Sequence, residues 1–144
     1  MKVLLQRVKK ASVSVDGKEI AKISAGLLAF VGVEKGDDSA CAEKLCEKLL
    51  NYRVFSDQDD KMNLSILDTH GELLLVSQFT LAANTQKGRR PSFDSAAPPE
   101  MGRALFDELV ELCREKAPVQ TGEFGASMQV ALINDGPVTF LLEA

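Results

Sequence analysis

The chain has 144 residues, enough for one domain whose hydrophobic core needs neither a disulfide nor a metal. An apolar fraction of 45% and a charged fraction of 26% are typical of soluble globular proteins, and a net charge of −4 argues against indiscriminate coating of nucleic acid. There is no apolar run long enough for a membrane span and no signal peptide at the N-terminus. Three cysteines cannot all pair and are interpreted as reduced, so we expect a cytoplasmic protein without a membrane partner.

The N-terminal part of the chain shows strand patterns. Residues 12–15 (SVSV) alternate between polar and apolar side chains, and Asp16-Gly17 is a strong signal for a hairpin turn into residues 18–24. Residues 26–33 (GLLAFVGV) form an apolar run typical of a buried strand. We therefore expect three strands before the first helix.

That helix is predicted for residues 36–51, where apolar side chains recur at helical spacing. The residues at its start, DDS, supply capping oxygens and negative charge. A short strand at residues 52–56 then leads into the polar turn DQDDK. Residues 72–81 (ELLLVSQFTL) follow as a long strand candidate with an apolar first half, as expected for a central position.

Residues 82–97 are the longest stretch without periodicity, and a loop of this length in a compact domain is usually functional or disordered. A second helix is predicted from Pro98-Pro99 to about Lys116. One face of this helix carries four large apolar side chains, namely Met101, Leu105, Leu109 and Leu112.

Residues 128–133 (MQVALI) and 138–142 (VTFLL) read as two closing strands separated by Asp-Gly-Pro. Because proline donates no ladder hydrogen bond, this break is either a hairpin connection or a place where Gly136-Pro137 presents backbone to something outside its own sheet. Together the elements predict a single α+β domain, residues 1–144, with a mostly antiparallel, curled, barrel-like sheet and two main helices.

The sequence has no conventional set of catalytic or metal-binding residues. His70 is the only histidine and lies in a predicted turn, so it offers neither a catalytic triad nor a Cys–His pair. No clustered thiols or histidines have metal-ligand spacing, and DQDDKMN lacks the glycine and terminal glutamate of a calcium loop. There is also no glycine-rich phosphate loop.

The segment SQFTL is the remaining candidate site. Ser77, Gln78 and Thr80 place three hydrogen-bonding side chains around Phe79 at the end of an apolar strand. The pattern is compatible with a strand that surfaces into a loop and equally with a site. Nothing nearby would activate Thr80 as a nucleophile, whereas backbone N–H groups at a strand end can hold an oxyanion.

Basic side chains gather in RVKK, at residues 7–10, and in KGRR, at residues 87–90. Such a patch on an acidic protein suits selective contact with a phosphate backbone. From charge alone, a solvated loop is the simpler reading.

Five motifs occur together: SQFTL at residue 77, KGRRPSF at residue 87, AAPPE at residue 96, FGASMQV at residue 124 and NDGPVT at residue 134. With the opening MKVLLQRVKKASVSVDG and the segment DDKMNLS, they resemble the D-aminoacyl-tRNA deacylases, also called D-Tyr-tRNA deacylases. The resemblance runs from Met1 to about Leu142. One departure is that LAANTQ lacks the aromatic residue expected after SQFTL.

The resemblance implies hydrolysis of the ester that joins a D-amino acid to the terminal adenosine of tRNA. It also implies removal of glycine mischarged onto alanine tRNA (Gly-tRNA-Ala) and sparing of L-aminoacyl-tRNA. The expected partners are tRNA and a second copy of the chain, because in the family a cis glycine-proline peptide, here Gly136-Pro137, reaches into the active site of the partner subunit. Its backbone would accept a D-residue or glycine and collide with an L side chain. No cofactor and no metal are expected.

The resemblance also assigns roles to individual residues. The catalytic-pocket strand of the family is matched by Ser77, Gln78, Phe79 and Thr80. In this resemblance, Phe79 acts through its backbone N–H and Gln78 orients the ribose or ester. The 2′-hydroxyl of the tRNA itself assists the attack of water. Arg7 resembles the arginine that braces the glycine-proline peptide. Phe124 and Met128 resemble residues that border the terminal adenine. From charge alone, we expect Lys87, Arg89 and Arg90 to contact tRNA phosphates.

Two competing hypotheses belong to other classes. A non-catalytic module that grips the tRNA acceptor end would be favoured by loss of the SQFT and GP motifs, and both motifs are present. A small-molecule esterase would need the nucleophile and base that the sequence lacks.

Overall fold

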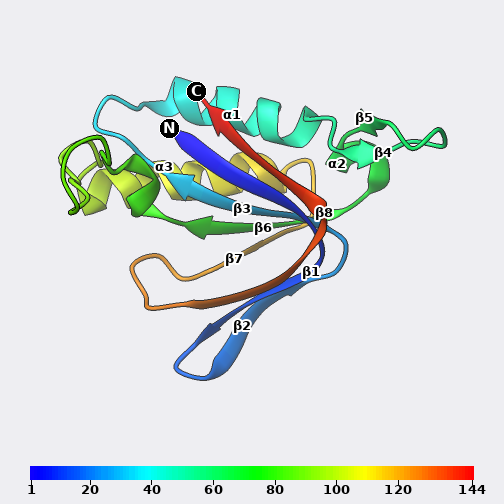
Figure 1. The fold of residues 1–144 in the computed structure, drawn as a ribbon, viewed down its shortest axis with the longest axis horizontal. Helices are drawn as coiled ribbons and strands as arrows, with labels where there is room; N and C mark the ends of the chain where they lie inside the picture. Colours follow the sequence, from blue (N-terminus) through cyan, green and yellow to red (C-terminus); the bar gives the residue numbers. More distant parts are fainter.

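One long strand, β1 (Lys2–Val15), organises the sheet in the computed structural model, which describes all 144 residues (Figure 1). Three strands pair antiparallel with β1: β2 (Lys18–Ile23), β3 (Gly26–Gly32) and β8 (Gln129–Glu143). Beyond β3, the strands β6 (Glu72–Ser77) and β7 (Val119–Thr121) continue the sheet in parallel. The strand order is β2-β1-β3-β6-β7, with β8 on β1, so the sheet is mixed.

The predicted hairpin between β1 and β2 is confirmed. Asp16 and Gly17 have φ values of 51° and 77°. A two-residue type I′ hairpin turn requires positive φ at both central positions, and an Asp-Gly pair adopts these angles with little strain.

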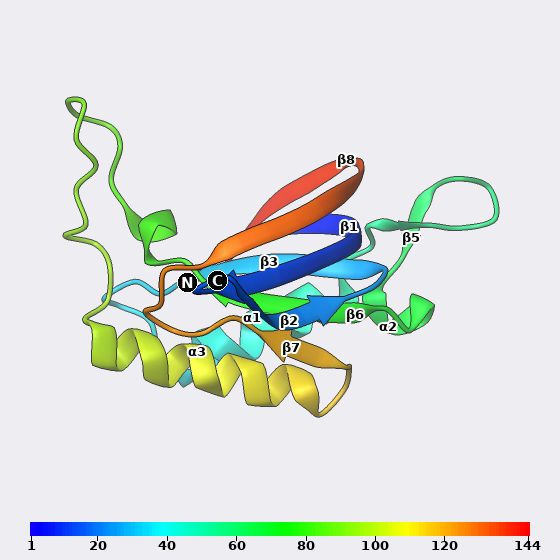
Figure 2. The ribbon, with the colours of Figure 1, turned by 90° about the horizontal axis from the view of Figure 1, so that it is seen from below.

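The central strands β3 and β6 bury apolar side chains on both faces of the sheet. The larger core lies between one face and the helices α1 (Ser39–Asn51) and α3 (Pro99–Arg114), which Figures 1 and 2 show on the same side of the sheet. A smaller core lies on the other face, where the second half of β1 and β2 fold back. Leu27, Leu73 and Leu75 point into the first core, whereas Leu28 and Leu74 point into the second, so the apolar runs are explained by burial on both faces.

Helix α1 begins as its sequence predicts. The Asp38 side chain accepts a hydrogen bond from the Cys41 N–H at 3.0 Å, and this bond holds the pKa of Asp38 below its usual value. Its buried side chains are the five at helical spacing: Ala42, Leu45, Cys46, Leu49 and Leu50.

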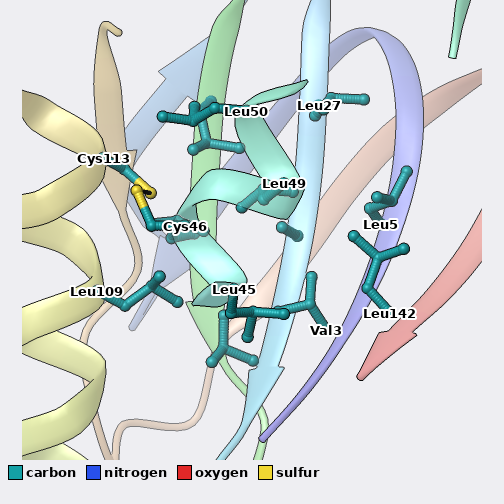
Figure 3. Close-up of a cluster of buried hydrophobic side chains, with 14 of the residues drawn as sticks. Val3, Leu5, Leu27, Leu45, Cys46, Leu49, Leu50, Leu109, Cys113 and Leu142 are labelled. Carbon is teal, nitrogen blue, oxygen red and sulfur yellow. Dashed lines mark hydrogen bonds between the residues drawn. The ribbon is translucent and has the colours of Figure 1, made fainter. Parts of the chain in front are cut away.

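Figure 3 shows α1 facing α3 across the larger core, with the sulfur atoms of Cys46 and Cys113 turned toward each other at 3.5 Å. All three cysteines are free thiols. The remaining elements are small: β4 (Phe55–Ser56), β5 (Met62–Leu64), α2 (Ile66–Thr69) and a 3₁₀ turn, η1 (Phe79–Ala82). None of the helices has the length and apolar character needed to cross a membrane.

The fold class, α+β with a curled sheet and two main helices, is confirmed, and three element predictions are corrected. The strand predicted for residues 72–81 ends at Ser77 and turns into η1. No element was predicted between the second helix and residue 128, and this segment contains the short strand β7. The two closing strands form one element, β8, which pairs with β1 on both sides of Gly136-Pro137. The break is therefore not a hairpin.

Candidate active site

A cavity of about 570 Å³ opens at the carboxyl ends of β3 and β6, within the size range of small-molecule sites. Its walls come from these strand ends, from the segments at 93–99 and 124–130, and from the start of α3. Most of the lining is apolar. It contains Ser77, Gln78, Phe79, Phe124 and Met128, so five residues predicted from the sequence meet in one place.

The floor of the cavity is the turn from β6 into η1. The Gln78 N–H donates to the Val31 carbonyl at 2.7 Å, and the next bonds run within the turn, with the Leu81 N–H donating to the Gln78 carbonyl at 3.2 Å. Gly32 permits this turn, since a Cβ there would stand 2.8 Å from the Leu81 Cβ and 3.1 Å from the Gln78 carbonyl oxygen. The lack of a side chain at this glycine thus lets the polar segment bend away from the sheet.

Two polar groups in the turn are relevant to chemistry. The Gln78 Nε2 donates to the Thr80 hydroxyl at 2.6 Å, although Thr80 does not itself line the cavity. Phe79 opens the 3₁₀ turn, so its N–H has no partner within that turn, and no loop or turn hydrogen bond uses it. A backbone N–H left free in this way can stabilise a developing oxyanion.

The cavity has no ionisable side chain. Every lining residue is apolar, glycine, proline, serine or glutamine. The arrangement therefore offers hydrogen-bond donors and acceptors for a polar ligand, while any acid or base must come from water or from the ligand.

Aromatic rings flank the cavity on two sides. Phe79 and Phe93 are 57% and 42% exposed, with ring centroids 5.2 Å apart. The sequence reasoning missed Phe93, and the signal that could have found it is that it is the only aromatic residue in the aperiodic stretch 82–97.

On the opposite wall, α3 fixes Phe124. A Cβ at Gly102 would lie 3.6 Å from the ring, which packs against this bare stretch of helix. The Arg103 guanidinium lies 4.7 Å from the ring centroid, within the range of a cation–π contact. Gly102 lines the cavity with Phe124, and neither it nor Arg103 was predicted as a site residue.

Gly136 and Pro137 lie far from this cavity in the same chain. Asn134 pairs with Val8, and Val8 pairs with Gly26, the first residue of β3, whereas the cavity begins at Val31. Five strand residues separate these positions by about 16 Å. The Gly136-Pro137 peptide is cis, and both residues are exposed.

Arg7 contacts Asp135, the residue that precedes this peptide. Its Nε donates to the Asp135 carbonyl at 2.9 Å and its Nη1 to the Val54 carbonyl at 2.6 Å. The side chain is 12% exposed and also lies 3.6 Å from the Asp135 carboxylate. Arg7 therefore ties the residue before Gly136 to the segment that follows α1.

Lys87, Arg89 and Arg90 are exposed and lie on the loop between η1 and α3, which stands out from the body in Figure 2. Backbone hydrogen bonds between Asn84 and Ser92, at 2.8 and 3.0 Å, close this loop. The three basic side chains do not line the cavity.

A sequence model of the D-Tyr-tRNA(Tyr) deacylase family matches residues 4–143. The D-aminoacyl-tRNA deacylase of Pseudomonas aeruginosa (strain LESB58) is 63% identical over 145 residues, covering 100% of both chains. That of Haemophilus influenzae (strain PittGG) is 58% identical over 142 residues, covering 99% of both.

Two solved structures share the fold. One, described as c-Myc DNA Unwinding Element Binding Protein, has a TM-score of 0.96 and 39% identity, covering 100% of this chain and 99% of the other. The second, described as a probable eukaryotic D-amino acid tRNA deacylase, has a TM-score of 0.84 at 18% identity, covering 99% of this chain and 98% of the other. The family model matches nearly the whole chain, and the relatives are identical at more than half of their positions. The chain therefore belongs to the D-aminoacyl-tRNA deacylase family of hydrolases.

Proposed function

We propose that this protein hydrolyses the ester between a D-amino acid and the terminal adenosine of tRNA, and releases glycine from mischarged alanine tRNA, while sparing L-aminoacyl-tRNA. The observation that carries the proposal is the cavity, which joins polar backbone and amide groups to aromatic walls and has no ionisable side chain. Such a site suits a substrate that brings its own catalytic hydroxyl.

In the proposed reaction, a water oxygen attacks the ester carbonyl carbon, assisted by the 2′-hydroxyl of the terminal ribose. The Phe79 N–H stabilises the oxyanion, and Gln78 orients the ribose or ester. The bond between the carbonyl carbon and the ribose 3′-oxygen then breaks. The 3′-oxygen takes up the proton that the attacking water has lost and leaves as a hydroxyl, while the water oxygen stays on the carbonyl carbon of the released amino acid. Thr80 receives a hydrogen-bonding role rather than a covalent one, since its hydroxyl is engaged by Gln78 and has no neighbouring base.

The adenine of the terminal nucleotide would lie against Phe124 and Met128. Base stacking on aromatic side chains is a common mode of recognition for unpaired nucleotides. Phe124 suits this role because Gly102 and Arg103 of α3 hold its ring in place.

The chirality filter would come from a second subunit, which completes the site. Within one chain, Gly136-Pro137 lies at the wrong end of β3 to reach the cavity. On β8 it is flanked by exposed Ile133, Phe140 and Leu141, which a homodimer would cover. In a two-fold dimer each Gly136-Pro137 could enter the cavity of the other subunit.

The same geometry accounts for the proposed breadth of substrates. A backbone wall rejects an L side chain by collision, whichever side chain it is, and it leaves room for a D side chain on the other side of the α-carbon. Glycine has no side chain to reject and would pass. The basic loop with Lys87, Arg89 and Arg90 would contact tRNA phosphates, and the reaction would take place in the cytoplasm on aminoacyl-tRNA.

The test is a deacylation time course on D-tyrosyl-tRNA and L-tyrosyl-tRNA, with enzyme at catalytic concentration. We expect rapid release from the D-ester and slow release from the L-ester. Release from neither ester, with tRNA still bound, would instead support the tRNA-binding module. Release from both would support an esterase without the chirality filter.

A further inference from the structure

The four residues from Asp135 to Val138 leave the regular ladder between β8 and β1. Asn134 pairs with Val8 and Thr139 pairs with Gln6, so the β8 segment between them faces Arg7 alone. Arg7 holds the entry of this bulge through the Asp135 carbonyl. The exit must be fixed by another group, because Gly136 has no side chain and Pro137 has no N–H.

The Asn134 side chain fixes that exit. Its Oδ1 accepts a hydrogen bond from the Val138 N–H at 2.8 Å, and its Nδ2 donates to the Val138 carbonyl at 3.3 Å. The carboxamide thus contacts both backbone groups of Val138, as a neighbouring strand would. The same Nδ2 donates to the Thr139 hydroxyl at 3.0 Å, which also accepts from Gln6 at 3.2 Å.

Resting on the proposed function, we propose that Asn134 is a positioning residue for chirality selection, whose side chain clamps the Gly136-Pro137 backbone in the shape that excludes L-aminoacyl esters. Val138 is buried and its N–H has the Asn134 side chain as its partner, so removing the clamp takes this bond away. The bulge itself is tight. A Cβ at Gly136 would stand 2.5 Å from the Val138 nitrogen.

The carboxamide is the group that this arrangement needs. It has a donor and an acceptor on one short planar side chain, whereas an aspartate at neutral pH only accepts. Asn134→Asp would keep the bond from the Val138 N–H and place negative charge beside the Val138 carbonyl. Asn134→Ala would remove both bonds.

The discriminating measurement is the ratio of kcat/KM for D-tyrosyl-tRNA to that for L-tyrosyl-tRNA. Both substrates meet the same folded enzyme, so this ratio does not depend on how much of a variant is folded. The excluding wall works by collision, and displacement on the order of 1 Å can alter reaction rates about a hundredfold. We expect Asn134→Ala to lower the D/L ratio at least about tenfold, the scale of one or two net hydrogen bonds.

Two further variants separate positioning from general stability. Gln6→Ala removes a neighbouring bond to Thr139 and leaves both bonds to Val138, so we expect it to keep the wild-type ratio. Asn134→Asp should give an intermediate ratio and slow hydrogen exchange at the Val138 amide, whereas Asn134→Ala should give fast exchange there.

A wild-type D/L ratio in Asn134→Ala would overturn the assignment while leaving the proposed function intact. An equal fall in Gln6→Ala would also overturn it, because the effect would then follow the local network rather than the clamp. If the wild-type enzyme itself does not discriminate between the two esters, the chirality proposal fails, and the role of Asn134 fails with it.

Discussion

At the residue scale, the site depends on which atoms are absent as well as on which are present. Gly32 lacks the Cβ that would collide with η1, whereas a Cβ at Gly102 would stand at an ordinary van der Waals distance from the ring of Phe124. The cavity lacks any ionisable side chain, so its polar character rests on Ser77, Gln78 and backbone groups. Small changes in the position of these groups should therefore have large effects on rate.

Gly32→Ala tests this directly. The added methyl would stand 2.8 Å from the Leu81 Cβ and 3.1 Å from the Gln78 carbonyl oxygen, so η1 must move. Overpacking of this kind costs about 1–3 kcal/mol in stability, and we expect deacylation to fall at least about tenfold. The matched control is Gly36→Ala, where no atom lies within 4 Å of the new Cβ. Melting temperature and single-turnover rate should change in the first variant only, and equal rates in both would contradict this role of Gly32.

Part of the site could be predicted from residue types alone. Ser77, Gln78 and Phe79 were recognisable because polar side chains directly follow an apolar strand. Phe93 was marked only as the single aromatic residue of an aperiodic stretch, and Gly102 had no signal, since their roles depend on contacts with Phe79 and Phe124 that only the folded chain creates. Gly136-Pro137 was conspicuous as a break, but its distance from the cavity follows from strand register, which the sequence does not specify residue by residue.

At the scale of elements, long periodic segments were predicted well and short ones were not. Helix α1 buries the five side chains that its spacing predicted. Apolar residues at helical spacing form one stripe along the helix, and the whole stripe packs against the core. Strand β7 has only three residues and gains its pairing from β6, so no local pattern marks it. The turn η1 begins where the apolar run of β6 ends, and the space left by Gly32 allows the turn to form there.

The contact between α1 and α3 leads to a prediction about thiol reactivity. Cys113 donates a hydrogen bond to Cys46 in the buried core, and this bond together with burial raises the pKa of Cys113 well above its usual value. Its thiol should therefore stay protonated and unreactive at alkaline pH, whereas Cys41 is partly exposed. We expect iodoacetamide at about pH 8 to modify Cys41 in the native protein and Cys113 only after unfolding. Mass spectrometry of peptides with and without denaturant measures this, and native labelling of Cys113 as fast as Cys41 would contradict the packing of the two helices.

At the scale of the whole molecule, the separation of cavity and Gly136-Pro137 is the reason to expect a dimer. Leu141 is 53% exposed on β8, beyond the bulge, and a lysine there would have to lose its hydration on association. We expect Leu141→Lys to convert a dimer into a monomer and to abolish discrimination between D- and L-esters, with light scattering as the readout of mass. Ile20→Lys, an equally drastic change at a 42% exposed residue on β2, serves as the control. A wild-type monomer, or a Leu141→Lys dimer with full selectivity, would contradict this arrangement.

The basic loop gives the last prediction, which concerns how the whole molecule meets tRNA. The loop that carries Lys87, Arg89 and Arg90 projects from a protein of net charge −4. Its positive charge must therefore attract tRNA phosphates although the protein as a whole repels them. Each phosphate contact releases counterions on binding, and its loss should reduce the slope of log affinity against log salt by about one. We expect the double variant Arg89→Glu/Arg90→Glu to weaken tRNA binding strongly at low salt, weakly at high salt, and with a shallower slope. Lys18→Glu/Lys22→Glu changes the net charge equally on exposed residues of β2. If the two double variants alter the slope alike, the effect comes from overall charge, and the loop has no specific contact with the phosphates.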